Sequence, residues 1–61
     1  MTALEWNARY PEGTLVLWLG MVRKTVGPSW DEGGRSIVKL APGFNGELSS
    51  NAFTEVVEVL P

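Results

Sequence analysis

The side chains best suited to chemistry in this sequence are carboxylates and cations, because it contains no cysteine and no histidine. Their absence removes the usual ligands of zinc, haem and iron–sulfur clusters, together with Cys or Ser–His nucleophilic catalysis. Two acidic pairs, Asp31–Glu32 and Glu55 with Glu58, are the nearest candidates for an acid–base couple. Adjacent acids beside glycines are usually only solvated, and Glu55 and Glu58 would face opposite sides of a strand. We therefore predict that the protein is not an enzyme and binds no metal or cofactor.

A glycine pair followed by a cation, Gly33-Gly34-Arg35, has the composition of a phosphate-binding loop. The loop that cradles phosphates in nucleotide-binding proteins has the spacing Gly-x-x-x-x-Gly-Lys-Ser/Thr and leads into a helix whose N-terminus faces the phosphate. Neither feature is present at this position. We therefore do not predict a phosphate site there.

Basic and aromatic side chains are interleaved along the middle of the chain and are stronger candidates for a binding surface. Small barrels can stack nucleobases on aromatic side chains beside a basic groove, whereas aromatic and arginine side chains also dominate the hot spots of protein interfaces. Five Lys and Arg residues stand against seven Asp and Glu, a net charge of −2, which favours a protein partner over nucleic acid. The predicted partner-binding residues are Trp18, Arg23, Lys24, Trp30, Arg35 and Phe44.

A length of 61 residues, of which 44% are hydrophobic and 20% charged, indicates one globular domain, residues 1–61, near the lower size limit for independent folding. Domains of this size commonly depend on disulfides, metals or partners, and the first two supports are missing here. The most apolar run, Leu15–Val22, is far shorter than the roughly 20 residues that span a bilayer. The early charges Glu5 and Arg9 argue against a signal peptide. We expect a small soluble protein of the cytoplasm with no membrane partner.

The first two segments are predicted to be strands. Ala3–Tyr10 alternates apolar and polar side chains with a period of two, which favours a half-buried strand; a short helix is the alternative, because Ala, Leu, Glu and Arg are good helix formers. Pro11 and Gly13 then supply a turn. In Thr14–Lys24 both the odd and the even positions are mostly apolar, which is typical of a strand covered on both faces. We expect a bend or bulge in this strand at Gly20. Its second face is covered either by the rest of the barrel or by another chain.

The next segment, Thr25–Gly34, is rich in glycine, proline and acidic residues and is predicted to be a loop of about ten residues. Trp30 lies inside it. A side chain of that size in a loop either folds back over the end of the barrel as a lid or is held out as an anchor for a partner, with its indole N–H free to donate. The sequence leaves both interpretations open.

The second half of the chain is predicted to contain further strands joined by tight turns. A strand over Arg35–Ala41 precedes a tight loop at Pro42–Gly46, and Glu47–Ser50 can form a short strand. One helical turn is predicted at Ser50–Thr54, followed by a valine-rich strand over Glu55–Leu60, because valine is stiff at χ1. Together these elements predict an all-β fold, a small SH3-like partly open barrel of roughly four or five antiparallel strands with one short helical turn near the C-terminus.

The second half also resembles a known family of small barrels. Its order of hydrophobic strand, variable loop, Asn-containing turn and acidic-valine strand is similar to the photosystem I subunit IV (PsaE) type of electron-transfer accessory protein. The matching residues are Asn51, Phe53, Glu55, Val56 and Val57. The resemblance implies an SH3-like barrel that serves as an accessory subunit. The first half departs from this pattern, since it lacks the family's Val-Gly-Thr-Val-type second strand and its basic ferredoxin-docking surface is thin.

A second resemblance involves Val22–Gly33, which is similar to the start of the barrel in the plasmid-encoded type II dihydrofolate reductases. Those enzymes are SH3-like tetramers whose active pore uses backbone contacts and a few polar residues. The pore motif Val-Gln-Ile-Tyr is missing from this chain. The resemblance therefore implies a fold and not the reductase activity.

These observations lead to one prediction of function and two alternatives. We expect a small non-catalytic protein-interaction module that acts as an accessory subunit, or as an inhibitor or regulator of a larger protein complex, of the kind that phages and mobile elements encode. The alternatives are a small barrel that binds nucleic acid and a PsaE-like accessory subunit of an electron-transfer complex. The strand edges of an open barrel would also allow homo-oligomer formation.

Overall fold

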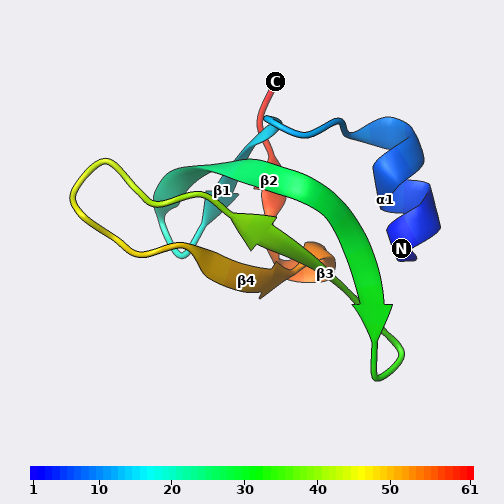
Figure 1. Cartoon of the computed structure of the whole chain (residues 1–61). Helices are drawn as coiled ribbons and strands as arrows, with labels where there is room; N and C mark the ends of the chain where they lie inside the picture. Colours follow the sequence, from blue (N-terminus) through cyan, green and yellow to red (C-terminus); the bar gives the residue numbers. More distant parts are fainter.

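The computed structural model describes all 61 residues. An antiparallel sheet of five strands in the order β4-β3-β2-β1-β5 forms most of the molecule (Figure 1). The elements are α1 (Ala3–Arg9), β1 (Leu15–Trp18), β2 (Met21–Glu32), β3 (Arg35–Leu40), β4 (Ser50–Phe53), the 3-10 helix η1 (Thr54–Val56) and β5 (Glu58–Val59). The prediction of an all-β, partly open barrel with a short helical turn near the C-terminus is confirmed.

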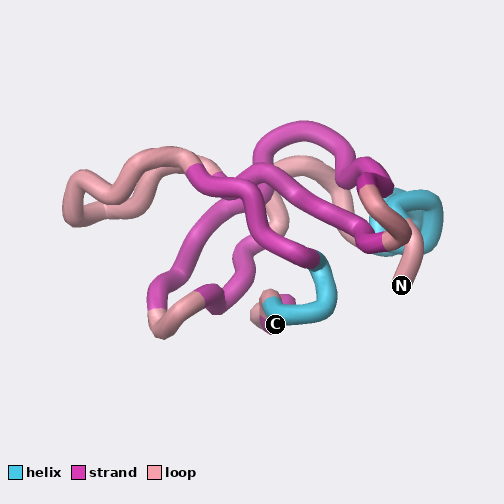
Figure 2. Tube along the Cα trace, turned by 90° about the horizontal axis from the view of Figure 1, so that it is seen from below, coloured by secondary structure: helices cyan, strands magenta, loops and turns pink.

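Strand β2 connects the two halves of the sheet. Its first residues, Met21–Lys24, pair with β1, and its later residues pair with β3. The register with β3 shifts between Val26 and Trp30, where Gly27 has a positive φ of 73°. A bulge of this kind bends a strand and increases its twist. As a result β2 curves around the core (Figure 1) and the sheet curls instead of lying flat (Figure 2).

The core lies between the inner face of the sheet and helix α1. Its buried hydrophobic cluster consists of Trp6, Val16, Val38, Leu40 and Ala52. Trp6 comes from α1 and is 4% exposed, and the centroid of its ring lies 4.5 Å from that of Tyr10. One bulky side chain therefore attaches the helix to the sheet.

Residues 3–9 form a helix, so the strand predicted for this segment is wrong. A capping box begins the helix: the Glu5 backbone N–H donates to the Thr2 hydroxyl, and the Thr2 backbone N–H donates to the Glu5 carboxylate. Trp6 is buried but Leu4, on the same parity, is 80% exposed, so the period of two does not mark a buried face. A short helix is stable here because Trp6 packs into the core.

Glu5 makes the helix cap sensitive to acid. Hydrogen bonds from the Thr2 backbone N–H, and then from the Thr2 hydroxyl, lower the pKa of Glu5 below its ordinary value of 4.5. Because the folded state has the lower pKa, the cap stabilises the fold above that ordinary value and loses this contribution as the pH falls through the folded-state pKa. Glu5→Gln is therefore expected to flatten the decline of the thermal midpoint as the pH falls below about 5. An unchanged pH profile in Glu5→Gln, followed by circular dichroism, would contradict this role.

Residues 14–24 form two strands instead of one. A tight turn joins β1 to β2 at Leu19 and Gly20, whose φ values are both positive, 50° and 77°. Two consecutive positive φ values allow a two-residue hairpin to match the twist of its strands. The bend expected at Gly20 is therefore a complete reversal, which pairs the two apolar halves of the segment with each other.

Residues 25–34 do not form the predicted loop. Most of this segment continues β2, and the turn to β3 is limited to Gly33 and Gly34, with φ of 61° and 80°. Trp30 is a strand residue that pairs with Ile37, so it is neither a lid nor an anchor carried by a loop. The glycine content of this segment suggested a loop, but Gly27 belongs to a bulge inside the strand.

The strand predicted at Arg35–Ala41 is confirmed as β3, but the elements after it are displaced along the sequence. An irregular loop replaces the short strand expected at Glu47–Ser50. Ser50–Phe53, within the expected helical turn, is strand β4; the helical turn follows as η1, and the last strand is shortened to Glu58–Val59. Pairing with β3 buries Ala52 in the core, and that burial outweighs the local capping signal.

Helix α1 also closes an open edge of β2. Asn7 Nδ2 donates to the Ser29 carbonyl over 3.0 Å, and the Ser29 backbone N–H donates to Asn7 Oδ1 over 2.7 Å. The side-chain amide satisfies both backbone groups as a neighbouring strand would.

Asn7→Ala is therefore expected to lower the free energy of unfolding by about 1–3 kcal/mol, because both Ser29 groups lose their partner. Chemical denaturation measures the change. Arg9→Ala, on the exposed side of the same helix, is the control. An equal loss in both variants would contradict the edge-closing role of Asn7.

Candidate functional site

Three apolar side chains form a row across the outer face of the sheet. The register places Trp30 of β2 opposite Ile37 of β3, and Ile37 opposite Phe53 of β4. Directly opposed residues share a face of a sheet, and the alternating residues Val38 and Ala52 are the ones buried in the core. Trp30 is 37% exposed and Phe53 is 36% exposed, so more than a third of each residue faces solvent.

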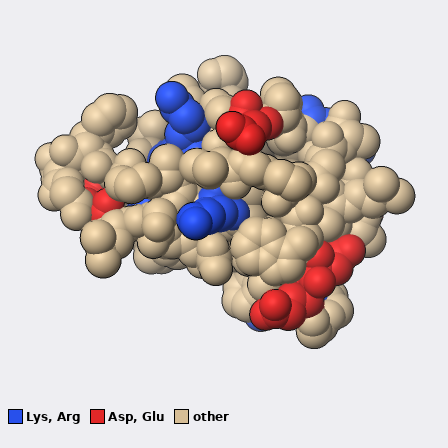
Figure 3. Space-filling view, viewed as in Figure 1, with Lys and Arg blue, Asp and Glu red and all other residues tan.

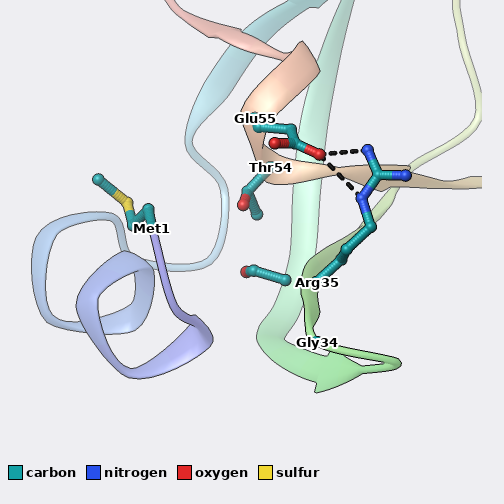
Figure 4. A pocket seen from close by; sticks show the side chains of 6 residues that line it. Met1, Gly34, Arg35, Thr54 and Glu55 are labelled. Carbon is teal, nitrogen blue, oxygen red and sulfur yellow. Dashed lines mark hydrogen bonds and ion pairs between the residues drawn. The ribbon is translucent and has the colours of Figure 1, made fainter.

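Arg35 completes this row and is held from two sides. Its guanidinium carbon lies 3.4 Å from the centroid of the Phe53 ring. Its Nε donates to Glu55 Oε1 over 2.8 Å, and its Nη2 donates to the same oxygen (Figure 4). A guanidinium already stacked on a ring and bonded to a carboxylate loses little further freedom on binding a partner. We call Trp30, Arg35, Ile37 and Phe53 the Trp30 surface.

A small polar pocket of about 90 Å³ lies beside Arg35 (Figure 4). It is lined by Met1, Gly34, Arg35, Ser36, Thr54 and Glu55. The Nε and Nη2 groups of Arg35 donate to Glu55, so an anion at these two donors would have to compete with that carboxylate. No group of three or more His, Cys, Asp or Glu side chains is placed to hold a metal ion.

The charges around the Trp30 surface are balanced, because the cations Arg35 and Lys39 on this face of β3 are matched by the two acids Glu32 and Glu55. Glu32 lies opposite Arg35 across the β2–β3 pair, and Glu55 forms an ion pair with the same guanidinium. On the face shown in Figure 3, acidic side chains lie at the lower right, near the top and at the left, and basic ones lie near the middle and along the upper edge, so neither sign of charge covers this face alone. A surface that attracts phosphates needs an excess of cations, and the charges here do not supply one.

Lys24 and Phe44 border a separate apolar groove. With Leu15, Val22, Arg23, Ala41 and Pro42 they line a hollow of about 250 Å³ between the β1–β2 hairpin and the loop over residues 41–49. Phe44 is 94% exposed. We call this hollow the Phe44 groove. The predicted site residues are thus divided, with Trp30 and Arg35 on one surface and Lys24 and Phe44 on the other.

Trp18 and Arg23 point toward the inside of the sheet, in contrast to their predicted place in a binding surface. Arg23 is 3% exposed; its Nε donates to the Ala41 carbonyl and its Nη2 to the Leu48 carbonyl, both over 2.8 Å. Its guanidinium carbon lies 5.6 Å from the centroid of the Trp18 ring, which packs against the core cluster. The hairpin places Arg23 opposite Val16 on the inner face. Both residues therefore have a structural role.

Sequence reasoning missed Ile37 and Phe53 as surface residues. Ile37 shares its parity in β3 with the exposed Arg35 and Lys39, so the alternation of that strand is a usable signal. Phe53 gave no such signal, because its segment was assigned to a helical turn, in which side chains do not alternate between two faces.

Comparison with known protein families, curated proteins and solved structures finds no match to this chain. The resemblances to PsaE-type proteins and to type II dihydrofolate reductases therefore stay predictions, and the Asn51–Phe53 part of the first is a strand here instead of a helical turn. The α-helix has 7 residues, and no helix has the length and apolar character needed to cross a bilayer.

Proposed function

We propose that this chain is a small non-catalytic protein-interaction module that binds a larger protein through the Trp30 surface. In this proposal it acts in the cytoplasm as an accessory subunit or regulator of a larger complex. The observation that carries the proposal is the row of Trp30, Ile37 and Phe53 on the outer face of the sheet, in which Ile37 is half-buried between the exposed Trp30 and Phe53.

The fold does not use these side chains in its interior. The buried cluster is built from other residues of α1 and the sheet. A contiguous apolar row on the outside of a sheet commonly marks an interaction site. Trp and Arg are also the residue types enriched in binding hot spots, and aromatic rings bury a large area for little loss of side-chain entropy.

A protein partner fits the charges better than nucleic acid does. A nucleic-acid surface gains affinity when unpaired cations release counterions from phosphates, but Arg35 is already paired with Glu55 and faced by Glu32. An apolar centre with a rim of both charge signs is typical of a protein interface.

Site-specific photocrosslinking in the cells that produce the protein tests the proposal. The photoreactive residue p-benzoylphenylalanine replaces Trp30 or Phe53 in the surface, and Leu4, 80% exposed on α1, is the control position. We expect the same protein to be crosslinked from both surface positions and not from Leu4. The proposal would be contradicted if neither surface position gave a crosslink, or if Leu4 gave the same adducts as the surface positions. A nuclease-sensitive adduct would replace it with nucleic-acid binding.

A further inference from the structure

The Phe44 groove has the features of an interface between two copies of the chain. We propose that it joins two copies about a twofold axis, with Phe44 of each copy lying on Leu15 and Val22 of the other. This interface shares no residue with the Trp30 surface, so the inference does not depend on the partner proposed for that surface.

Both walls of the groove expose apolar side chains. The strand wall carries Leu15 and Val22, each more than two-fifths exposed, and the loop wall carries the almost fully exposed Phe44. An adjoining hollow of about 470 Å³ shares Val22 and Phe44 with the first and extends the groove toward Gly20. Apolar strips of this kind are normally covered, and small domains often gain their missing stability by oligomerisation.

The loop that carries Phe44 projects from the body but is fastened at its base. Arg23 donates to the carbonyls of Ala41 and Leu48, near the two ends of the loop, and the Gly43 backbone N–H donates to the Glu47 carbonyl over 3.0 Å. Figures 1 and 2 show the loop extending beyond the sheet. A fastened loop with an aromatic ring at its tip can reach a second molecule and loses little conformational freedom when it docks.

The charges of the groove identify a second copy as the occupant. Lys24 lines one hollow and Glu47 lines the other, and the ion pair within the chain involves neither residue. A twofold rotation exchanges the two ends of the groove, so that Lys24 of each copy meets Glu47 of the other. A partner of a single charge sign would match one end and be repelled by the other, whereas a second copy matches both.

Sedimentation equilibrium of the full chain from micromolar to millimolar concentration tests this assembly. We expect a mass that approaches twice the 6.7 kDa of the chain. Phe44→Asp is expected to weaken association by about 100-fold, because it places a charge in the apolar centre of the interface. The side chain is almost fully exposed within the chain, so the variant should fold. Lys39→Glu, which alters an exposed cation outside the groove, is the control and should associate as the wild type does.

A charge exchange provides the sharper test. Lys24→Glu and Glu47→Lys are each expected to weaken association by about tenfold, because the twofold axis turns two attractive pairs into two repulsive ones. The two changes together should restore it, which a merely structural role of either residue would not produce. A monomer at every concentration, a dimer that persists in Phe44→Asp, or no restoration in the double variant would overturn the inference. A dimer that dissociates in Trp30→Ala but not in Phe44→Asp would also overturn the inference, and would make the Trp30 surface the interface between copies. The two proposals are tested independently, because a chain that is monomeric can still be crosslinked to a partner from position 30.

Discussion

Trp6→Ala is expected to leave the chain unfolded or close to unfolding at room temperature. The indole is 4% exposed, belongs to the core cluster and attaches α1 to the sheet. Replacing a buried tryptophan by alanine lowers the free energy of unfolding by about 3–5 kcal/mol. A domain of this length has a total of about 3–9 kcal/mol. Urea denaturation followed by circular dichroism measures the loss.

Leu4→Ala is the matched control, because Leu4 lies on the same helix but is largely exposed. Its effect should stay below about 0.5 kcal/mol. Trp6→Phe keeps an aromatic ring in the core and should recover part of the lost stability. A Trp6→Ala variant with the wild-type denaturation midpoint would contradict the conclusion that this side chain attaches the helix.

Arg23→Met is expected to lower the free energy of unfolding by about 2–4 kcal/mol and to loosen the loop over residues 41–49. Methionine keeps much of the aliphatic volume but leaves the carbonyls of Ala41 and Leu48 without their donor. The contact of the guanidinium with the Trp18 ring is lost as well. Hydrogen exchange of the backbone amides in the loop, together with denaturation, measures both effects.

Lys24→Met is the control for Arg23→Met, because it removes the same charge from the adjacent, exposed position. At concentrations where the chain is monomeric it should change stability by less than about 0.5 kcal/mol and leave loop exchange unchanged. Equal losses in the two variants would show that net charge, and not the buried hydrogen bonds of Arg23, sets the stability of the loop.

The fold class was predictable because short apolar segments separated by Gly and Pro turns specify strands and reversals at many positions. Local structure was less predictable where tertiary contacts decide it. The segment with Trp6 alternates like a strand, but burial of that indole and the Thr2–Glu5 cap favour a helix. Glycine marked turns correctly at Gly33 but misled at Gly27, where it belongs to a bulge in a long strand.

The candidate site was predictable in part for the same reason. Trp30 and Arg35 were identified from residue type alone, and they do lie on one surface. Phe53 could be added only with the β3–β4 register, which depends on a pairing between distant segments. Arg23 was misplaced because a one-strand interpretation of residues 14–24 gives no hairpin, and the hairpin is what turns this side chain inward.

The decisive measurement for the Trp30 surface is a binding affinity. The partner protein identified by photocrosslinking is titrated against the wild-type chain, Trp30→Ala and Leu4→Ala. We expect Trp30→Ala to bind about 30-fold more weakly, a loss of about 2 kcal/mol that is typical of an interface hot spot. Leu4→Ala should bind as the wild type does, and both variants should stay folded, because neither side chain belongs to the core cluster. A folded Trp30→Ala variant that binds with wild-type affinity would contradict the assignment of this surface as the binding site.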